Sequence, residues 1–209
     1  MRASSGLGIV LALAATLVAA TDVSAHRTEG YLQAARIGVE PDRVLITLDL
    51  MPGMDMAEAL IAALDRDRDG SLSTEEQRGY VVRVLSALEV QIDRRPLPMR
   101  VLSWSFPELW AFRRGEGTIR LKIDAAPPEV RAGSHRLLFR NAHLAGQSAY
   151  LANALVPESP RVTVKAQRRD RDQSELAIEY TVDGDSPGAA LAWVLGTLAA
   201  AFLMVRFRP

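Results

Sequence analysis

The chain of 209 residues contains no cysteine, which excludes disulfides, thiolate metal sites, a cysteine nucleophile and a lipid-modified cysteine. It has no excess of charge of either sign, because 25 lysines and arginines balance 25 aspartates and glutamates. This balance gives no indication of a nucleic-acid partner. The sequence also lacks a Gly-x-Ser-x-Gly elbow, a His-Glu-x-x-His motif and a glycine-rich phosphate loop. We therefore expect a protein that is not an enzyme.

The N-terminus has the pattern of a secretory signal peptide. Arg2 provides a basic start, residues 7–20 form a short apolar run, and Val23 and Ala25 stand at the −3 and −1 positions of a cleavage site. We predict a signal peptide over residues 1–25, which leaves His26 as the first mature residue. An uncleaved membrane anchor is the alternative.

The C-terminus has the pattern of a membrane anchor. Residues 189–205 carry no charge, and at 1.5 Å per residue they span about 26 Å as a helix. Arg206 and Arg208 follow, and basic residues beyond a span stay in the cytoplasm. We predict a single-pass anchor with a short basic tail over residues 187–209 in the inner (cytoplasmic) membrane. The N-terminal domain would then lie in the periplasm or at the cell exterior. A buried helix of a soluble protein is the alternative, which the turn formers and charges of residues 183–188 disfavour.

Residues 26–186 form the expected exported domain, and much of it has the pattern of short β-strands. Apolar residues alternate with polar ones, and Pro41-Asp42 predicts a turn between the first two strands. The expected strands are Tyr31–Val39, Val44–Leu50, Leu88–Ile92, Arg100–Phe106, Thr118–Ile123, His135–Arg140, Arg161–Ala166 and Leu176–Val182. These predict an α+β domain built on an antiparallel β-sandwich. We expect residues 141–155 to form a loop with a helical turn.

Two helices interrupt the strand pattern. Apolar residues of Met54–Leu64 recur along one helical face, as they do from Thr74 to Leu88. Between the two helices lies an acidic segment of twelve residues, from Asp65 to Glu76. We therefore predict a helix–loop–helix insert over residues 54–88.

The acidic loop has oxygen donors at the spacing that calcium requires. Calcium takes six to eight oxygen ligands, supplied in such loops by positions 1, 3, 5, 7, 9 and 12. Those positions are Asp65, Asp67, Asp69, Ser71 through its carbonyl, Ser73 through water, and Glu76 through both carboxylate oxygens. Position 6 must turn with positive φ, which Gly70 permits. Ser73 and Glu76 also predict a capping box at the start of the second helix. We expect Glu76 to cap this helix without the ion and to turn to the ion when calcium binds.

Residues 54–88 resemble the EF-hand family in the loop positions quoted and in the flanking helices. The resemblance implies a single calcium-binding hand with a structural or partner-presenting role. EF-hands usually occur in pairs, and no second loop is found. This implies pairing with another protein or a second copy, or packing on the chain's own sheet. Gln77 is polar where family members often begin the next helix's apolar face.

A second hypothesis starts from the three histidines, His26, His135 and His143. After cleavage His26 would carry a free amino group, and an amine with an imidazole ring is a plausible copper ligand set. The alternative function is therefore a transition-metal (copper or nickel) handling accessory protein. Trp104, Phe106 and Trp110 form an aromatic cluster, for which core packing and a carbohydrate or peptide platform are both open.

Overall fold

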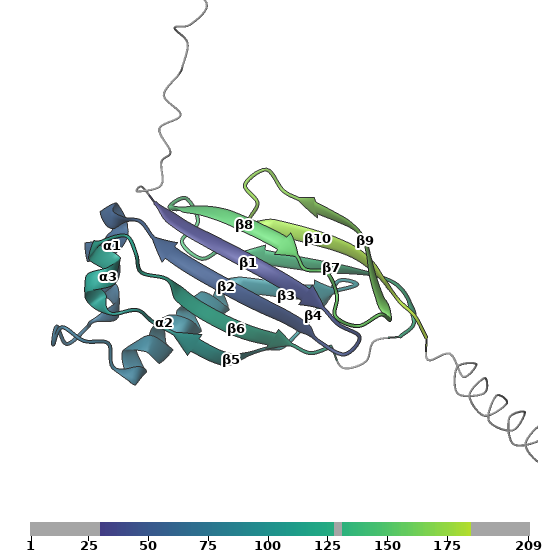
Figure 1. The fold of residues 1–209 in the computed structure, drawn as a ribbon, viewed down its shortest axis with the longest axis horizontal. Coiled ribbons are helices and arrows are strands. Elements are labelled where there is room, and N and C mark those ends of the chain that lie inside the picture. Colours follow the sequence, from purple (N-terminus) through teal and green to yellow (C-terminus); the bar gives the residue numbers. More distant parts are fainter. Residues whose placement is uncertain (1–29, 128–130, 185–209) are drawn as a thin grey trace, which may run out of the picture.

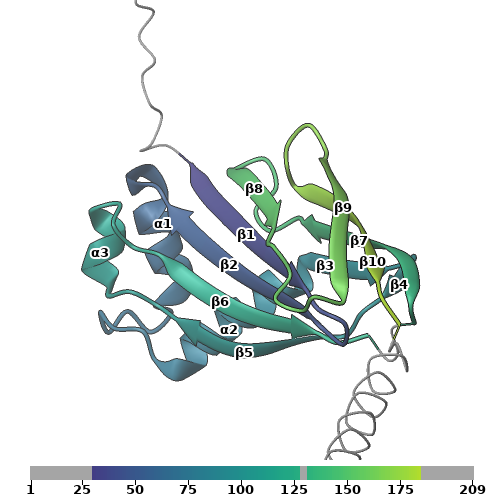
Figure 2. The same cartoon turned by 45° about the vertical axis from the view of Figure 1, so that its right-hand side comes forward.

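Two five-stranded β-sheets form the body of the computed structural model, which describes residues 30–127 and 131–184. The first sheet has the order β5 (Met99–Ser105), β6 (Ile119–Ala125), β2 (Val44–Pro52), β1 (Tyr31–Val39) and β8 (Ser148–Ala154). The second has the order β4 (Arg95–Pro96), β3 (Leu88–Ile92), β7 (Gly133–Asn141), β10 (Glu175–Val182) and β9 (Val162–Arg169). The sheets lie one behind the other (Figures 1 and 2).

Alternating side chains build the core between the sheets. In β10 every second residue is buried, and the apolar residues of β1, β2, β6 and β7 contribute to the same buried cluster. This alternation is the period of a strand with one face on the core. The expected β-rich α+β architecture is therefore confirmed at this level. The predicted signal peptide and C-terminal anchor lie outside the described residues. Among the helices described, none has the length and apolar character needed to cross a bilayer.

The prediction of an entirely antiparallel arrangement is wrong at one pair of strands. β1 pairs with β2 in antiparallel fashion but with β8 in parallel. The expectation of a loop over residues 141–155 is also wrong, because β8 occupies Ser148–Ala154. β8 is rich in alanine and buries only Ala152, so its own sequence gives little strand signal. Pairing with β1 determines its conformation.

Three helices gather at one end of the domain (Figure 1). α1 (Met54–Leu64) has the predicted bounds, and α2 (Thr74–Ser86) ends two residues before the predicted Leu88, which begins β3. Both helices lie between β2 and β3, as the sequence predicts. α3 (Leu109–Arg113) was not predicted; it packs beside α1, and its Arg113 forms an ion pair with Glu58 at 2.7 Å. The helical end therefore packs as part of the domain.

Candidate metal centre

The acidic loop connects α1 to α2 at the end of the domain opposite the C-terminal end of β10 (Figure 1). α1 ends at Leu64, which is buried, and Asp65 is its C-cap. The buried apolar faces of α1 and α2 are part of the core, so both ends of the loop are held by packing. The loop residues between these ends are mostly exposed.

Hydrogen bonds to aspartate side chains fold the loop inward. The two Asp65 carboxylate oxygens accept from the backbone N–H groups of Asp69 and Gly70, each at 3.1 Å. Asp67 accepts from the Asp69 N–H at 3.2 Å, and Asp69 accepts from the Ser71 N–H at 2.8 Å. Aspartate commonly stabilises turns by bonding backbone groups two residues on. These bonds give the acidic residues a structural role within the loop.

Two residues of the loop have positive φ. Gly70 has φ +83°, as predicted for position 6, and its missing side chain makes that conformation inexpensive. Arg68, two residues earlier, has φ +60°. No pattern in the sequence predicts this second left-handed residue. The two reversals bring the start of the loop back toward its end.

Glu76 closes the loop from its far end. Ser73 and Glu76 form the predicted capping box at the start of α2, with the Ser73 hydroxyl accepting from the Glu76 N–H at 3.3 Å. One Glu76 carboxylate oxygen accepts from the Ser73 N–H at 2.9 Å. The other accepts from the Arg66 N–H at 2.6 Å, which joins the end of the loop to its beginning. The predicted capping box is therefore confirmed, and the movement of Glu76 from this cap to an ion stays a prediction.

Three of the predicted ligands converge. One carboxylate oxygen from each of Asp65, Asp67 and Glu76 lies within 4.8 Å of the other two. Oxygens that each lie about 2.3–2.6 Å from one calcium ion are at most about 5 Å apart, so this spacing suits a shared ion. Within the described ranges, this is the one group of three or more metal-ligating side chains so arranged.

The other predicted ligands lie in the same loop but outside that group of three. An oxygen of the Asp69 carboxylate accepts from both the N–H and the hydroxyl of Ser71, each at 2.8 Å. The Ser73 hydroxyl donates to Glu76 at 2.8 Å. Three of the six proposed ligand residues thus have converging carboxylate oxygens, and the other three belong to the same loop.

Two carboxylates of the group have pKa values shifted in opposite directions. Hydrogen bonds lower the pKa of Glu76, that from the Ser73 hydroxyl first and those from the Arg66 and Ser73 N–H groups next. For Asp67 the bond from the Asp69 N–H also lowers the pKa, but desolvation, the charges of Asp69 and Glu76 and the contact with the Asp65 side chain together outweigh it. The pKa of Asp67 is therefore raised. Mutual repulsion of this kind favours a cation.

Gln77 attaches the loop to the first sheet, a role that sequence reasoning missed. Its side-chain NH₂ donates to the Leu72 carbonyl at 3.0 Å, and its carbonyl oxygen accepts from the indole N–H of Trp104 in β5 at 3.1 Å. Leu72, at position 8 of the loop, packs against the core. Gln77, whose polar side chain differs from the apolar residue expected there, therefore connects the loop to the first sheet. The helix–loop–helix insert thus packs on the chain's own first sheet, one of the expected arrangements.

A buried network of polar side chains connects α2 to the first sheet and to the turn after β7. The Tyr80 hydroxyl of α2 lies 2.6 Å from the hydroxyl of Tyr31 in β1 and 3.1 Å from Nε2 of His143. Burial raises the pKa of Tyr80 to about 12, and burial followed by the nearby Arg83 charge lowers the pKa of His143 to about 4. Near neutral pH the network is therefore uncharged. It ties the second helix of the insert to the first sheet.

The remaining candidates are distributed over the domain. His135 lies on β7 and His143 in the turn after it, as predicted. Both ring nitrogens of His135 have hydrogen-bond partners, the Asp93 carboxylate at 2.8 Å and the Arg131 carbonyl at 2.7 Å. His26 lies outside the described residues. Among the aromatic residues, Phe106 packs edge-on against Tyr80, whereas Trp110 is 56% exposed. The aromatic cluster is thus split between core and surface.

Comparison of the chain with protein-family models, with curated protein sequences and with solved structures found no match.

Proposed function

We propose that the loop of residues 65–76 binds one calcium ion and that the protein presents this loop on an exported domain with a C-terminal membrane anchor. The convergence of the Asp65, Asp67 and Glu76 oxygens within 4.8 Å is the single observation that carries the proposal. Calcium prefers such hard, charged oxygen ligands, and a lone loop outside the cytoplasm needs only the weak affinity typical of extracellular modules.

The proposed ligands comprise the side chains of Asp65, Asp67, Asp69 and Glu76, the Ser71 carbonyl and, through water, Ser73. The ion would neutralise the charges of Asp69 and Glu76, which act together with desolvation to raise the pKa of Asp67. Leu72 and Gln77 attach the loop to the domain. Calcium binding would therefore stabilise the present arrangement of α1 and α2 and would not change the angle between them. The role is structural, or the presentation of the helical end to a partner.

Calorimetric titration of the full chain in detergent micelles tests this proposal. We expect one calcium per chain, with weaker binding of magnesium, which demands near-ideal octahedral geometry. Asp67→Asn is a suitable variant because Asp67 is exposed, and the amide oxygen can still accept the bond from the Asp69 N–H. It should weaken binding without unfolding the loop. Absence of binding heat at millimolar calcium, with the protein folded, would refute the proposal.

A further inference from the structure

The described chain ends beside the start of β9. β10 ends at Val182, and the backbone N–H of Asp183 donates to the Arg161 carbonyl at 2.8 Å. From Gly184, the last described residue, only five residues lead to Ala189, where the uncharged run begins. Five residues reach at most about 18 Å when fully extended. If residues 189–205 span a bilayer, this end of the domain lies close to its surface.

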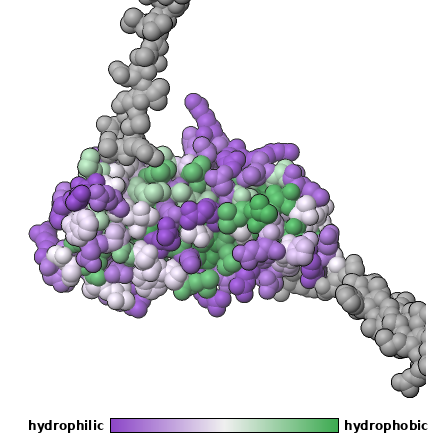
Figure 3. All heavy atoms as spheres, viewed as in Figure 1, coloured by the Kyte–Doolittle hydropathy of each residue, from purple (hydrophilic) through white to green (hydrophobic). Residues whose placement is uncertain are grey.

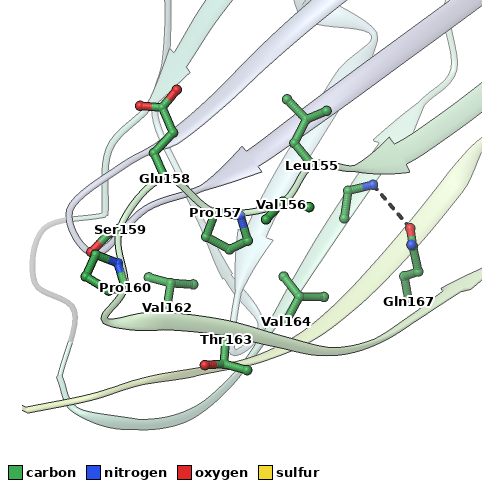
Figure 4. A pocket seen from close by; sticks show the side chains of 11 residues that line it. Leu155, Val156, Pro157, Glu158, Ser159, Pro160, Val162, Thr163, Val164 and Gln167 are labelled. Carbon is green, nitrogen blue, oxygen red and sulfur yellow. Dashed lines mark hydrogen bonds between the residues drawn. The ribbon is translucent and has the colours of Figure 1, made fainter.

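An apolar segment projects at this same end. Residues 155–161 connect β8 to β9 and are called the β8–β9 loop here. Val156 is 91% exposed, more than any other large hydrophobic residue described, and Leu155 is 45% exposed. Figure 4 shows Val156 and Pro157 facing Val162 and Val164 of β9 across a shallow groove. Hydrophobic surface is also visible on this face in Figure 3.

The β8–β9 loop is held in place rather than frayed. Its Leu155 N–H donates to the Ile37 carbonyl of β1 at 2.8 Å. The N–H groups of Glu158 and Ser159 donate to the two carboxylate oxygens of Glu40, at 2.9 and 3.0 Å. The exposed Val156 therefore belongs to a loop that hydrogen bonds hold in place.

These bonds satisfy the backbone N–H groups of Leu155, Glu158 and Ser159, which lowers the cost of contact with an apolar environment. Backbone donors without partners are costly in lipid, because no water reaches them. The Arg161 N–H donates to the Ser159 hydroxyl at 3.2 Å, and Pro157 and Pro160 have no N–H to satisfy. The Glu158 side chain is turned away from Val162 and Val164, so its carboxylate can remain in water (Figure 4). A loop of this composition suits the interface of a membrane.

We propose that the β8–β9 loop lies against the lipid surface of the membrane, with Leu155 and Val156 among the headgroups. The inference rests on the proposed anchor over residues 187–209, because only the anchor brings this end of the domain to lipid. Its consequence is an orientation: the acidic loop, at the opposite end of the domain, faces away from the membrane (Figure 1). The calcium site would then be open to solvent and to a partner.

The absence of cysteine allows a direct test on the full chain. Val156→Cys, labelled with an environment-sensitive fluorophore, is compared with Met54→Cys labelled in the same way. Met54 is a matched control, since it is apolar and 49% exposed. It follows the end of β2 that pairs with Tyr31, whereas Leu155 is bonded to Ile37 near the other end of β1. Both variants are reconstituted into phosphatidylcholine vesicles with and without lipids that carry a nitroxide on the headgroup.

We expect the label at position 156 to shift its emission to the blue and to lose fluorescence to the nitroxide lipids, while the label at position 54 does neither. Equal behaviour of the two labels overturns the proposal. So does a blue shift at position 156 without quenching, which would mean that a second copy or another segment of the chain covers the loop.

Flotation of the vesicles separates failure of this inference from failure of the anchor. Protein that does not float with the vesicles overturns the anchor and this inference together. Protein that floats but shows no difference between the labels overturns only the placement of the loop. Neither result bears on calcium binding, which is measured separately in micelles.

Discussion

Replacing Glu76 by glutamine separates the two roles that the structure gives this residue. A glutamine can still serve the capping box, because its amide oxygen can accept a bond from the Ser73 N–H. It cannot supply two charged oxygens to an ion. We therefore expect Glu76→Gln to fold in a calcium-free buffer and to lose most of the stabilisation by calcium.

The size of that stabilisation follows from mass action. An extracellular calcium module has a Kd of about 10⁻⁴–10⁻³ M. At about 10 mM calcium, binding to the folded state alone would stabilise the domain by roughly 1.4–2.7 kcal/mol. For a domain of this size each kcal/mol corresponds to about 2–4 °C in Tm, so we expect calcium to raise the wild-type Tm by about 3–11 °C.

The assay is thermal unfolding followed by circular dichroism, with and without calcium. Glu75→Gln is the matched control, because it removes the same charge from the neighbouring residue. Glu75 is exposed and is paired with Arg78 at 2.7 Å. The control should keep the calcium-induced rise in Tm, and Glu76→Gln should show almost none. A rise of equal size in both variants would refute the role of Glu76 as a ligand.

Four further predictions concern the loop and its support. Gly70→Ala should destabilise the domain by about 1–2 kcal/mol in urea unfolding, since alanine is strained at φ +83°. Gly79→Ala, in an open position of α2, should instead stabilise it by about 0.5–1 kcal/mol, and destabilisation there would contradict the reasoning. Gln77→Leu, which breaks the bond to Trp104, should cost about 1 kcal/mol and weaken calcium binding in calorimetry; unchanged affinity would show that the loop needs no such support. Because the pKa of His143 falls to about 4 on folding, the unfolded chain alone takes up this proton between pH 6.5 and 4. Calcium-free stability should therefore decrease as the pH falls through this range, with a shallower slope in His143→Gln.

Local signals in the sequence were sufficient for most elements of the fold. Alternation identified β1, β2 and β10, and helical periodicity identified α1 with its observed bounds. The capping box was also predictable, because it depends on two residues three positions apart. Such features are governed by interactions between near neighbours in the chain.

Features that depend on distant parts of the chain could not be predicted in this way. β8 is a strand because it lies beside β1, more than a hundred residues earlier, and its alanine-rich sequence carries no strong preference. The contact of Gln77 with Trp104 spans 27 positions, and the approach of Tyr80 to His143 spans 63. The acidic loop could be read as a metal site from its spacing, whereas its attachment to the sheet became visible only in three dimensions.

Determination of the structure with saturating calcium tests the central claim most directly. We predict one ion in the loop, about 2.3–2.6 Å from oxygens of Asp65, Asp67, Asp69 and Glu76. We also predict that the Glu76 carboxylate will have left the Arg66 N–H, to which it is now bonded at 2.6 Å. A folded loop that holds no ion at millimolar calcium, with Glu76 still bonded to Arg66, would contradict the claim.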